Sequence, residues 1–194
     1  MRMITLLLAL SIVAGTAPAA IADDKHHDNR HKVTARLSGY NEVHFIVGPP
    51  PALRGAVSTE AQGKFRARID EHAGMISYEL SYEGLEGLVT QAHIHFGQRH
   101  TVGAIVVWLC QTPGTPAPAA VAALTPFCPA EGTVTGTIVA AQVLTAPGQG
   151  IDTGEFDEVV RAIRAGAAYA NVHSTLFPPG EIRGQIHGDR GHGH

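Results

Sequence analysis

Hydrophobic and polar residues alternate in short stretches along most of the chain after residue 32. The alternation is clearest at residues 33–37, and again at 65–69 and 76–82 on either side of a polar turn at 70–74. A period of two sends successive side chains to opposite faces of a β-strand. The pattern therefore predicts β-strands in these stretches and a β-hairpin over residues 65–82.

Further strands are predicted along the rest of the chain, bounded by glycine, proline and other turn residues. One of them, at residues 104–109, is apolar enough to be buried on both faces. The others lie at residues 88–96, 133–143, 167–174 and 181–187, the last two joined by a turn at 177–180.

One helix is predicted near residues 154–165. Asp152 can cap its N-terminus, Glu155 follows in capping-box register, and Gly166 can end it. Its apolar stripe comprises Phe156, Val159, Val160 and Ile163. Many short strands with one short helix predict a mainly β fold, an antiparallel β-sandwich or Greek-key barrel.

The N-terminus has the pattern of an export signal. Arg2 precedes an apolar run at residues 3–14, and Ala20-Ile21-Ala22 supplies the small residues that a signal peptidase recognises. The run is shorter than the roughly 20 residues of an ordinary transmembrane helix, although a retained anchor is the alternative. We expect a signal peptide at 1–22, a disordered His-rich arm at 23–32, one domain at 33–187 and a flexible His/Gly tail at 188–194.

The composition of the chain limits the kinds of partner that we expect it to bind. The chain is 44% hydrophobic and 16% charged, with a formal net charge of −3. A chain without a basic excess is a poor nucleic-acid binder, so no nucleic-acid partner is expected. No second long apolar run follows residue 22, so we expect no membrane span after signal cleavage and a periplasmic or secreted location.

Cys110 and Cys128 are the only two cysteines. In an oxidising compartment an even pair favours a disulfide, which would close a loop with little structure of its own. A cysteine metal site or a redox pair is the alternative, but the C-x-x-C spacing is missing.

The sharpest chemical feature is His93-Ile94-His95. Residues i and i+2 of a strand share a face, so both imidazoles project together and form a preformed chelate for Cu²⁺ or Zn²⁺. The alternative is that they are ordinary polar residues bonded to backbone or carboxylate groups.

Other polar residues could complete such a site. His173 shares one face of its strand with Tyr169 and Asn171, and it would join the pair if the two strands are neighbours. His44 and His187 are candidates for a fourth ligand. Arg183 is expected to form a structural ion pair with Glu181 or Glu42. Further histidines in the tails can capture metal weakly: His26, His27, His31, His192 and His194.

Four sequence blocks resemble the CHRD domain family, named from chordin. They are A-R-L-S-G-Y-N-E-V at 35–43, A-H-I-H-F-G at 92–97, G-A-A-Y-A-N-V-H-S at 166–174 and P-G-E-I-R-G-Q-I at 179–186. The chain departs from the family at His44 to Gly48, where prolines are usual, and in a long loop between the cysteines. The resemblance implies a secreted β-sandwich domain.

Three functions compete at this stage. The first is non-catalytic binding of copper or zinc, with copper favoured by the Irving–Williams order. The second is a module that docks on a secreted or envelope protein or polysaccharide, with structural histidines. The third is a copper enzyme resembling superoxide dismutase, for which no second set of zinc ligands is evident.

Overall fold

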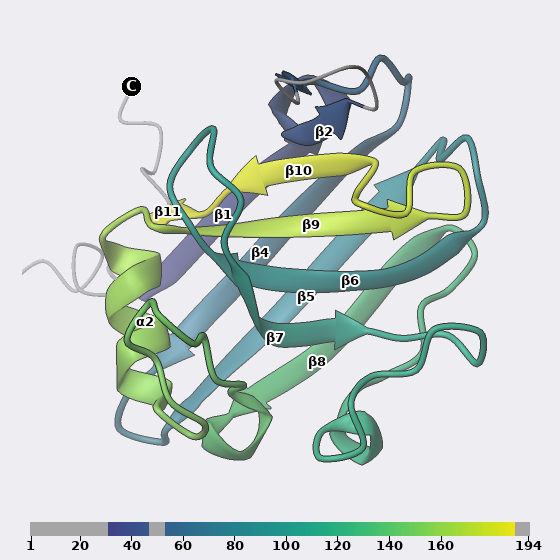
Figure 1. Cartoon of the computed structure of the whole chain (residues 1–194). Coiled ribbons are helices and arrows are strands. Elements are labelled where there is room, and N and C mark those ends of the chain that lie inside the picture. Colours follow the sequence, from purple (N-terminus) through teal and green to yellow (C-terminus); the bar gives the residue numbers. More distant parts are fainter. Residues whose placement is uncertain (1–30, 47–52, 189–194) are drawn as a thin grey trace, which may run out of the picture.

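The chain folds as one strongly twisted antiparallel sheet that curls into a nearly closed barrel (Figure 1). The computed structural model describes residues 31–46 and 53–188. The predicted signal peptide falls outside these ranges, as do all of the predicted arm except His31 and Lys32 and all of the predicted tail except Gly188. Along the sheet the strands run β7-β6-β9-β10-β1-β4-β5-β8, with β11 beside β1, and β2 pairs with β3 separately. The mainly antiparallel β fold is confirmed.

Most strand bounds follow the predicted alternation, but β2 and β3 were not predicted, and the strand predicted at 181–187 is divided into β10 and β11. The strands are β1 (Lys32–Ser38), β2 (His44–Ile46), β3 (Leu53–Gly55), β4 (Gln62–Asp70), β5 (Met75–Glu83), β6 (Val89–Phe96), β7 (Ala104–Cys110), β8 (Gly132–Val139), β9 (Ala168–Ser174), β10 (Ile182–Gln185) and β11 (His187–Gly188). The predicted hairpin is β4–β5. The strand predicted at 133–143 was too long, because a 3-10 turn at Ala140–Gln142 follows β8 and the Gln142 side chain accepts a hydrogen bond from the Val139 amide. Two further 3-10 turns are Gly39–Asn41 and Ala122–Leu124.

The one α-helix among the described residues, α2 (Phe156–Arg164), packs across one end of the barrel (Figure 1). Its predicted apolar stripe is buried, and Gly166 follows it with a φ of +67°. The predicted cap was wrong. The helix begins one turn later than Asp152 implied, Glu155 is its N-cap residue, and the Glu155 carboxylate reaches back to the Asp152 amide at 2.8 Å.

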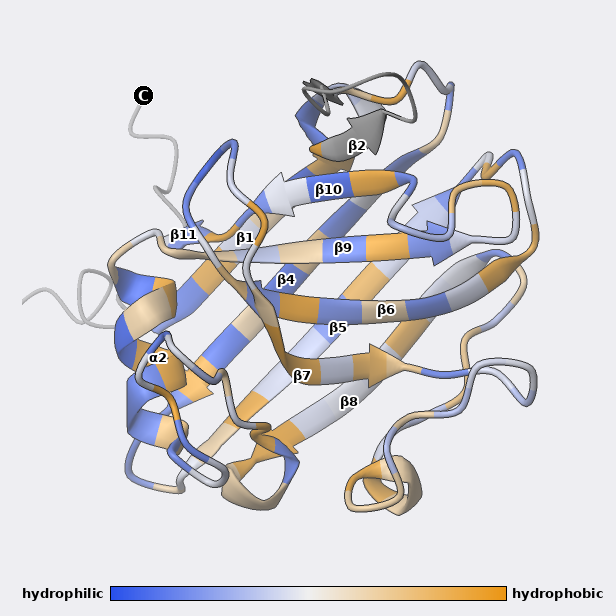
Figure 2. Cartoon of the chain, in the orientation of Figure 1, coloured by the Kyte–Doolittle hydropathy of each residue, from blue (hydrophilic) through white to orange (hydrophobic). Residues whose placement is uncertain are grey.

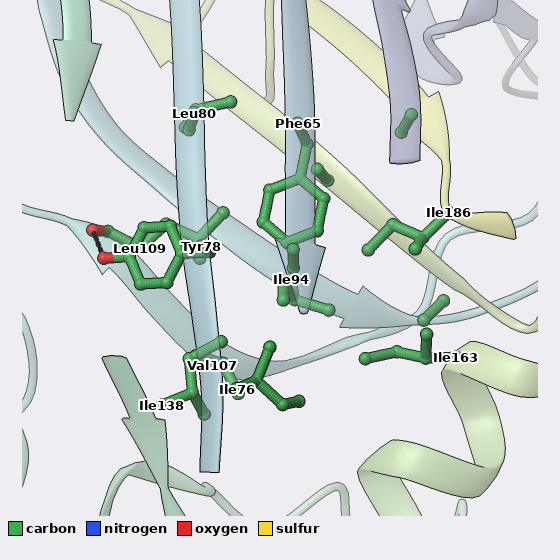
Figure 3. Packing of buried hydrophobic residues seen from close by; sticks show 14 of the residues in the cluster. Phe65, Ile76, Tyr78, Leu80, Ile94, Val107, Leu109, Ile138, Ile163 and Ile186 are labelled. Carbon is green, nitrogen blue, oxygen red and sulfur yellow. Dashed lines mark hydrogen bonds between the residues drawn. The ribbon is translucent and has the colours of Figure 1, made fainter. Parts of the chain in front are cut away.

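The inward-facing side chains of the strands fill the barrel (Figure 3). Figure 2 shows the corresponding bands of hydrophobic and hydrophilic residues along β1 and β4. The edge strands β7 and β8 lie beside each other without pairing. Tyr78 on β5 reaches across this seam and donates its hydroxyl to the Leu109 carbonyl at 2.6 Å. Gly136 on β8 leaves room for that ring, since a Cβ there would lie 2.5 Å from the Tyr78 hydroxyl oxygen.

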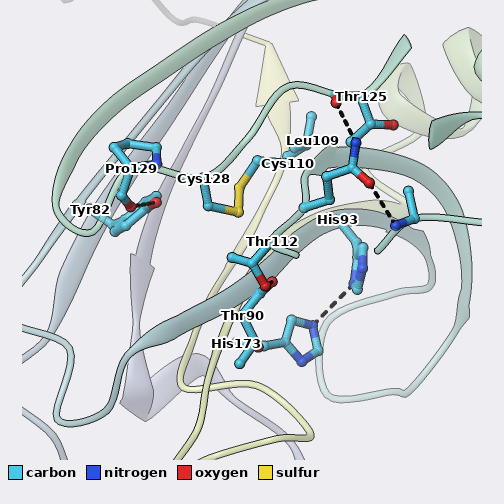
Figure 4. Close-up of a disulfide and its surroundings, with 12 residues drawn as sticks. Tyr82, Thr90, His93, Leu109, Cys110, Thr112, Thr125, Cys128, Pro129 and His173 are labelled. Atoms are coloured by element: carbon cyan, nitrogen blue, oxygen red, sulfur yellow. Dashed lines mark hydrogen bonds between the residues drawn. A yellow bond between two sulfur atoms is a disulfide. The ribbon is translucent and has the colours of Figure 1, made fainter. Parts of the chain in front are cut away.

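The predicted disulfide between Cys110 and Cys128 is present (Figure 4). The loop that it closes is more ordered than the sequence suggested, because the buried Gln111 side chain organises it. Its amide nitrogen donates to the Ala122 and Thr125 carbonyls, and its oxygen accepts from the Ala117 amide. Ala117 and Val121 thereby pack on Trp108, outside the barrel.

The disulfide should stabilise the protein mainly through the unfolded chain. We expect Cys110→Ala/Cys128→Ala to lower the free energy of unfolding by about 3 kcal/mol, the typical value for a loop of this size. Urea denaturation of both proteins measures it.

Reducing agent supplies the control for this variant. It should lower the stability of the wild type by a similar amount and leave the double variant unchanged. Equal stability of oxidised wild type and double variant would contradict the expectation.

Candidate metal centre

Three histidines meet on the outer face of the sheet, opposite the barrel core. His93 and His95 lie on β6, whose neighbour β9 carries His173, so the strand adjacency on which a three-histidine cluster depends exists. One nitrogen from each ring lies within 4.8 Å of those of the other two, and all three residues are buried. In the described part of the chain this is the one group of three or more histidine, cysteine or acidic residues with such spacing.

The outer face is buried here because a loop and an aromatic side chain cover it. The loop between β6 and β7 folds over the cluster, and the Gly103 carbonyl bonds to the His95 ring at 2.9 Å. Only glycine fits at residue 103, since a Cβ there would lie 1.7 Å from the Phe96 carbonyl oxygen. On the other side the Trp108 ring packs edge-on against His93, with centroids 4.3 Å apart.

Hydrogen bonds indicate which ring nitrogens of the cluster carry hydrogen. His95 Nδ1 and His173 Nδ1 face the Gly103 and Pro178 carbonyls at 2.9 Å and 2.8 Å. A carbonyl only accepts, so both Nδ1 atoms carry hydrogen, and in the neutral rings both Nε2 atoms present lone pairs. His93 Nδ1 lies 3.2 Å from His173 Nε2 and donates to it when His173 is neutral (Figure 4).

Within the cluster, two buried ring nitrogens have no hydrogen-bond partner among the described residues. They are His93 Nε2 and His95 Nε2. A buried polar atom without a partner costs free energy. The cluster therefore contains lone pairs that an electrophile such as a metal ion could use.

Burial disfavours the charged forms of His93 and His95. Loss of hydration is the main cause that lowers the pKa of His95 to about 4, with repulsion from His173 and Arg183 adding to it and the Gly103 hydrogen bond opposing it. The pKa of His93 lies well below its usual value for the same main reason, with repulsion from the other two histidines adding to it. Neutral imidazole is the form that binds metal.

Tyr169 connects the cluster to Arg183. Its ring stacks on His95, with centroids 4.7 Å apart and planes 4° from parallel, and the Arg183 guanidinium carbon lies 3.3 Å from its ring centre. Because β9 lies between β6 and β10, the imidazole and the guanidinium contact opposite faces of the tyrosine. Arg183 also donates to the Thr101 and Gln98 carbonyls and so holds the covering loop.

The acidic residues expected near Arg183 have their own partners. Glu42 accepts a hydrogen bond of 2.5 Å from Asn171, which lies directly opposite both His93 and Arg183 on the neighbouring strands. The electrostatic attraction of Glu42 supports the charged form of Arg183, although burial lowers the pKa of that guanidinium overall. Glu181 accepts from the Thr59 hydroxyl at 2.9 Å and from the Glu86 amide at 2.8 Å. Its pairing with Arg183 stays a prediction.

Of the two candidates for a fourth ligand, His187 is not part of the cluster. His187 is exposed on β11, opposite Thr34 of β1. His44 lies on β2, and its side chain is outside the described structure. Sequence analysis missed Trp108 and Gly103; the signal for Trp108 was its place in a strand predicted to be buried on both faces.

The depressed pKa values make stability depend on pH. Unfolded histidine titrates near 6.5, so the unfolded chain binds more protons than the folded one between that value and about 4, and stability falls as the pH drops through this window. His95 contributes at most about 3 kcal/mol of this loss. Urea midpoints at pH 7 and pH 4.5 measure it.

His95→Asn is the matched variant, since its amide can still donate to Gly103 while the titrating group is gone. Its stability should fall less between these two pH values than that of the wild type. Equal losses in the two proteins would show that His95 does not titrate in this way.

Comparison with known proteins gives one match, to a protein family. The model of the CHRD domain family matches residues 33–186, most of the chain. No curated protein and no solved structure matches it. Among the described residues no helix is long and apolar enough to cross a membrane. The chain is therefore a member of the CHRD domain family.

Proposed function

We propose that this protein is an exported CHRD-domain protein that binds a divalent transition metal ion through His93, His95 and His173, without catalysing a reaction. The observation that carries the proposal is the cluster of three buried imidazoles, whose donor nitrogens lie within 4.8 Å of one another and include the unpartnered Nε2 of His95. A buried lone pair without a partner costs free energy, and a bound metal ion would satisfy it.

The spacing of the donor atoms supports this function. Metal–nitrogen bonds of about 2.0–2.1 Å place two ligands of a tetrahedral ion about 3.3 Å apart. His93 Nδ1 and His173 Nε2 already lie at 3.2 Å. For both to bind, His93 moves its proton from Nδ1 to Nε2, which is a change of tautomer without net proton release.

The surroundings also resemble those of known metal ligands. Metal-binding histidines usually donate their second ring nitrogen to a carbonyl or carboxylate, which orients the ring. His95 and His173 do this through Gly103 and Pro178. Three neutral nitrogen donors suit copper and zinc alike, and the Irving–Williams order favours copper where copper is available.

Export and the absence of catalysis rest on separate observations. The disulfide and the family match are consistent with secretion, as is the signal pattern at residues 1–22. A two-metal enzyme of the superoxide dismutase kind needs a second, bridged set of ligands. The described residues hold one candidate cluster.

Removing one ligand tests the proposal. Wild type should bind one equivalent of Cu²⁺, and Zn²⁺ more weakly, whereas His95→Asn and His173→Asn should each weaken binding by at least about 100-fold. Both substitutions can retain the hydrogen bonds to Gly103 and Pro178. Competition titration measures affinity, and electron paramagnetic resonance of the Cu²⁺ protein reports nitrogen ligands.

All these proteins should carry alanine at residues 26, 27, 31, 192 and 194, so that tail histidines do not contribute. His72→Asn, on the exposed β4–β5 turn, is the control and should bind like the wild type. His187→Asn tests the predicted fourth ligand directly. Absence of stoichiometric metal at micromolar concentration, or full binding by His95→Asn, would refute the proposal.

A further inference from the structure

The outer face of β1 and β4 carries a group of cationic residues, separated from the histidine-bearing strands by β10. Five cations project from these two neighbouring strands while the alternate residues enter the core. We call them the basic ladder: Lys32, Arg36, Lys64, Arg66 and Arg68. In register, Lys32 lies opposite Arg68, and Arg36 lies opposite Lys64.

This register opposes what stability alone would favour. Like charges directly opposite each other on neighbouring strands are destabilising. Arg66 has a carboxylate partner, Glu79 on β5, at 3.0 Å. Among the residues that the structure describes, Arg36 and Lys64 have no carboxylate partner. The cations also gather in a chain whose formal net charge is −3.

The basic ladder lies in a groove of about 1280 Å³. Arg99 from the loop between β6 and β7 contributes a further cation to its lining, and Ser77 and Thr135 contribute hydroxyl groups from β5 and β8. Of the described residues that line the groove, Glu79 is the only acidic one. The groove therefore offers a row of positive charges bordered by hydroxyl groups.

We propose that this groove binds a linear acidic polysaccharide. Its carboxylate groups would lie against the basic ladder, and its hydroxyl groups against Ser77 and Thr135. Charge complementarity is the main argument, because several cations along one open groove match a polymer with regularly repeated negative charges. The proposal is independent of the metal centre, since none of the three histidines lines the groove.

Two other polyanionic partners fit less well. Single-stranded nucleic acid binds through exposed aromatic rings as well as cations. The one aromatic residue in the groove lining, Tyr78, is buried, and its hydroxyl bonds to Leu109. An anionic membrane favours apolar side chains beside the cations, but the exposed large hydrophobic residues of the described chain lie outside the groove: Tyr40, Leu88, Val102, Leu124, Phe127 and Leu176.

Polygalacturonate is the probe, titrated into the protein by calorimetry at low ionic strength and about pH 7.5, where exposed histidines are neutral. Wild type should bind it, and added salt should weaken the binding. Arg36→Gln/Lys64→Gln should weaken it about tenfold or more and make its salt dependence shallower. Uncharged dextran should not bind.

Two variants control for charge and folding. Arg161→Gln/Arg164→Gln removes two exposed cations from α2, outside the groove, and should bind like the wild type. Arg36→Lys/Lys64→Arg exchanges the two cations and should retain binding. The thermal midpoint of Arg36→Gln/Lys64→Gln should equal or exceed that of the wild type, because a like-charge pair is removed.

The proposal is overturned if wild type does not bind polygalacturonate, or if both glutamine variants weaken binding equally. It is also overturned if duplex DNA or phosphatidylglycerol vesicles bind more tightly than polygalacturonate and depend on Arg36 and Lys64. Those outcomes would assign the groove to nucleic acid or to a membrane surface instead.

Discussion

Burial of a polar layer on the outside of the barrel is the constraint on which the rest of this structure depends. The outer faces of β6, β9 and β10 carry imidazole, phenol, amide and guanidinium groups, and these are covered as completely as the hydrophobic core on the other side of the sheet. Polar groups can be buried only if they are hydrogen-bonded or otherwise satisfied. The covering loop meets this demand with backbone carbonyls at Gln98, Thr101 and Gly103.

Most of these buried groups have hydrogen-bond partners, and two of the atoms without one lie in the candidate site. Arg183 obtains two carbonyls and an aromatic face, and Asn171 donates to Glu42 and to the Ile182 carbonyl. The buried carboxylate of Glu42 offsets the guanidinium charge, so a metal cation at the histidines would not add to an uncompensated positive charge. The lone pairs of His93 and His95 remain without partners among the described residues.

The same alternation of side chains produces two different surfaces. On β6 and β9 the outward residues are neutral and covered, whereas on β1 and β4 they are cationic and line an open groove. The two faces differ in whether other parts of the chain lie over them. The loop between β6 and β7 and the disulfide-closed segment above Trp108 lie over the histidines, so the former face can hold a small ion and the latter a large ligand.

Sequence alone determined most of the strands, the helix after residue 154, the disulfide and the common face of His93 and His95, because each depends on local periodicity or on a unique pair of residues. It could also show that His173 shares a face with Tyr169 and Asn171. Tertiary structure decided that β9 lies beside β6, which brings His173 to the pair, and that His187 lies exposed on β11 instead. It also decided that Trp108 and Gly103 enclose the site, and that β1 and β4 align cation against cation. The order of strands in a sheet and the path of a covering loop arise from contacts between residues far apart in the chain, and no local pattern records them.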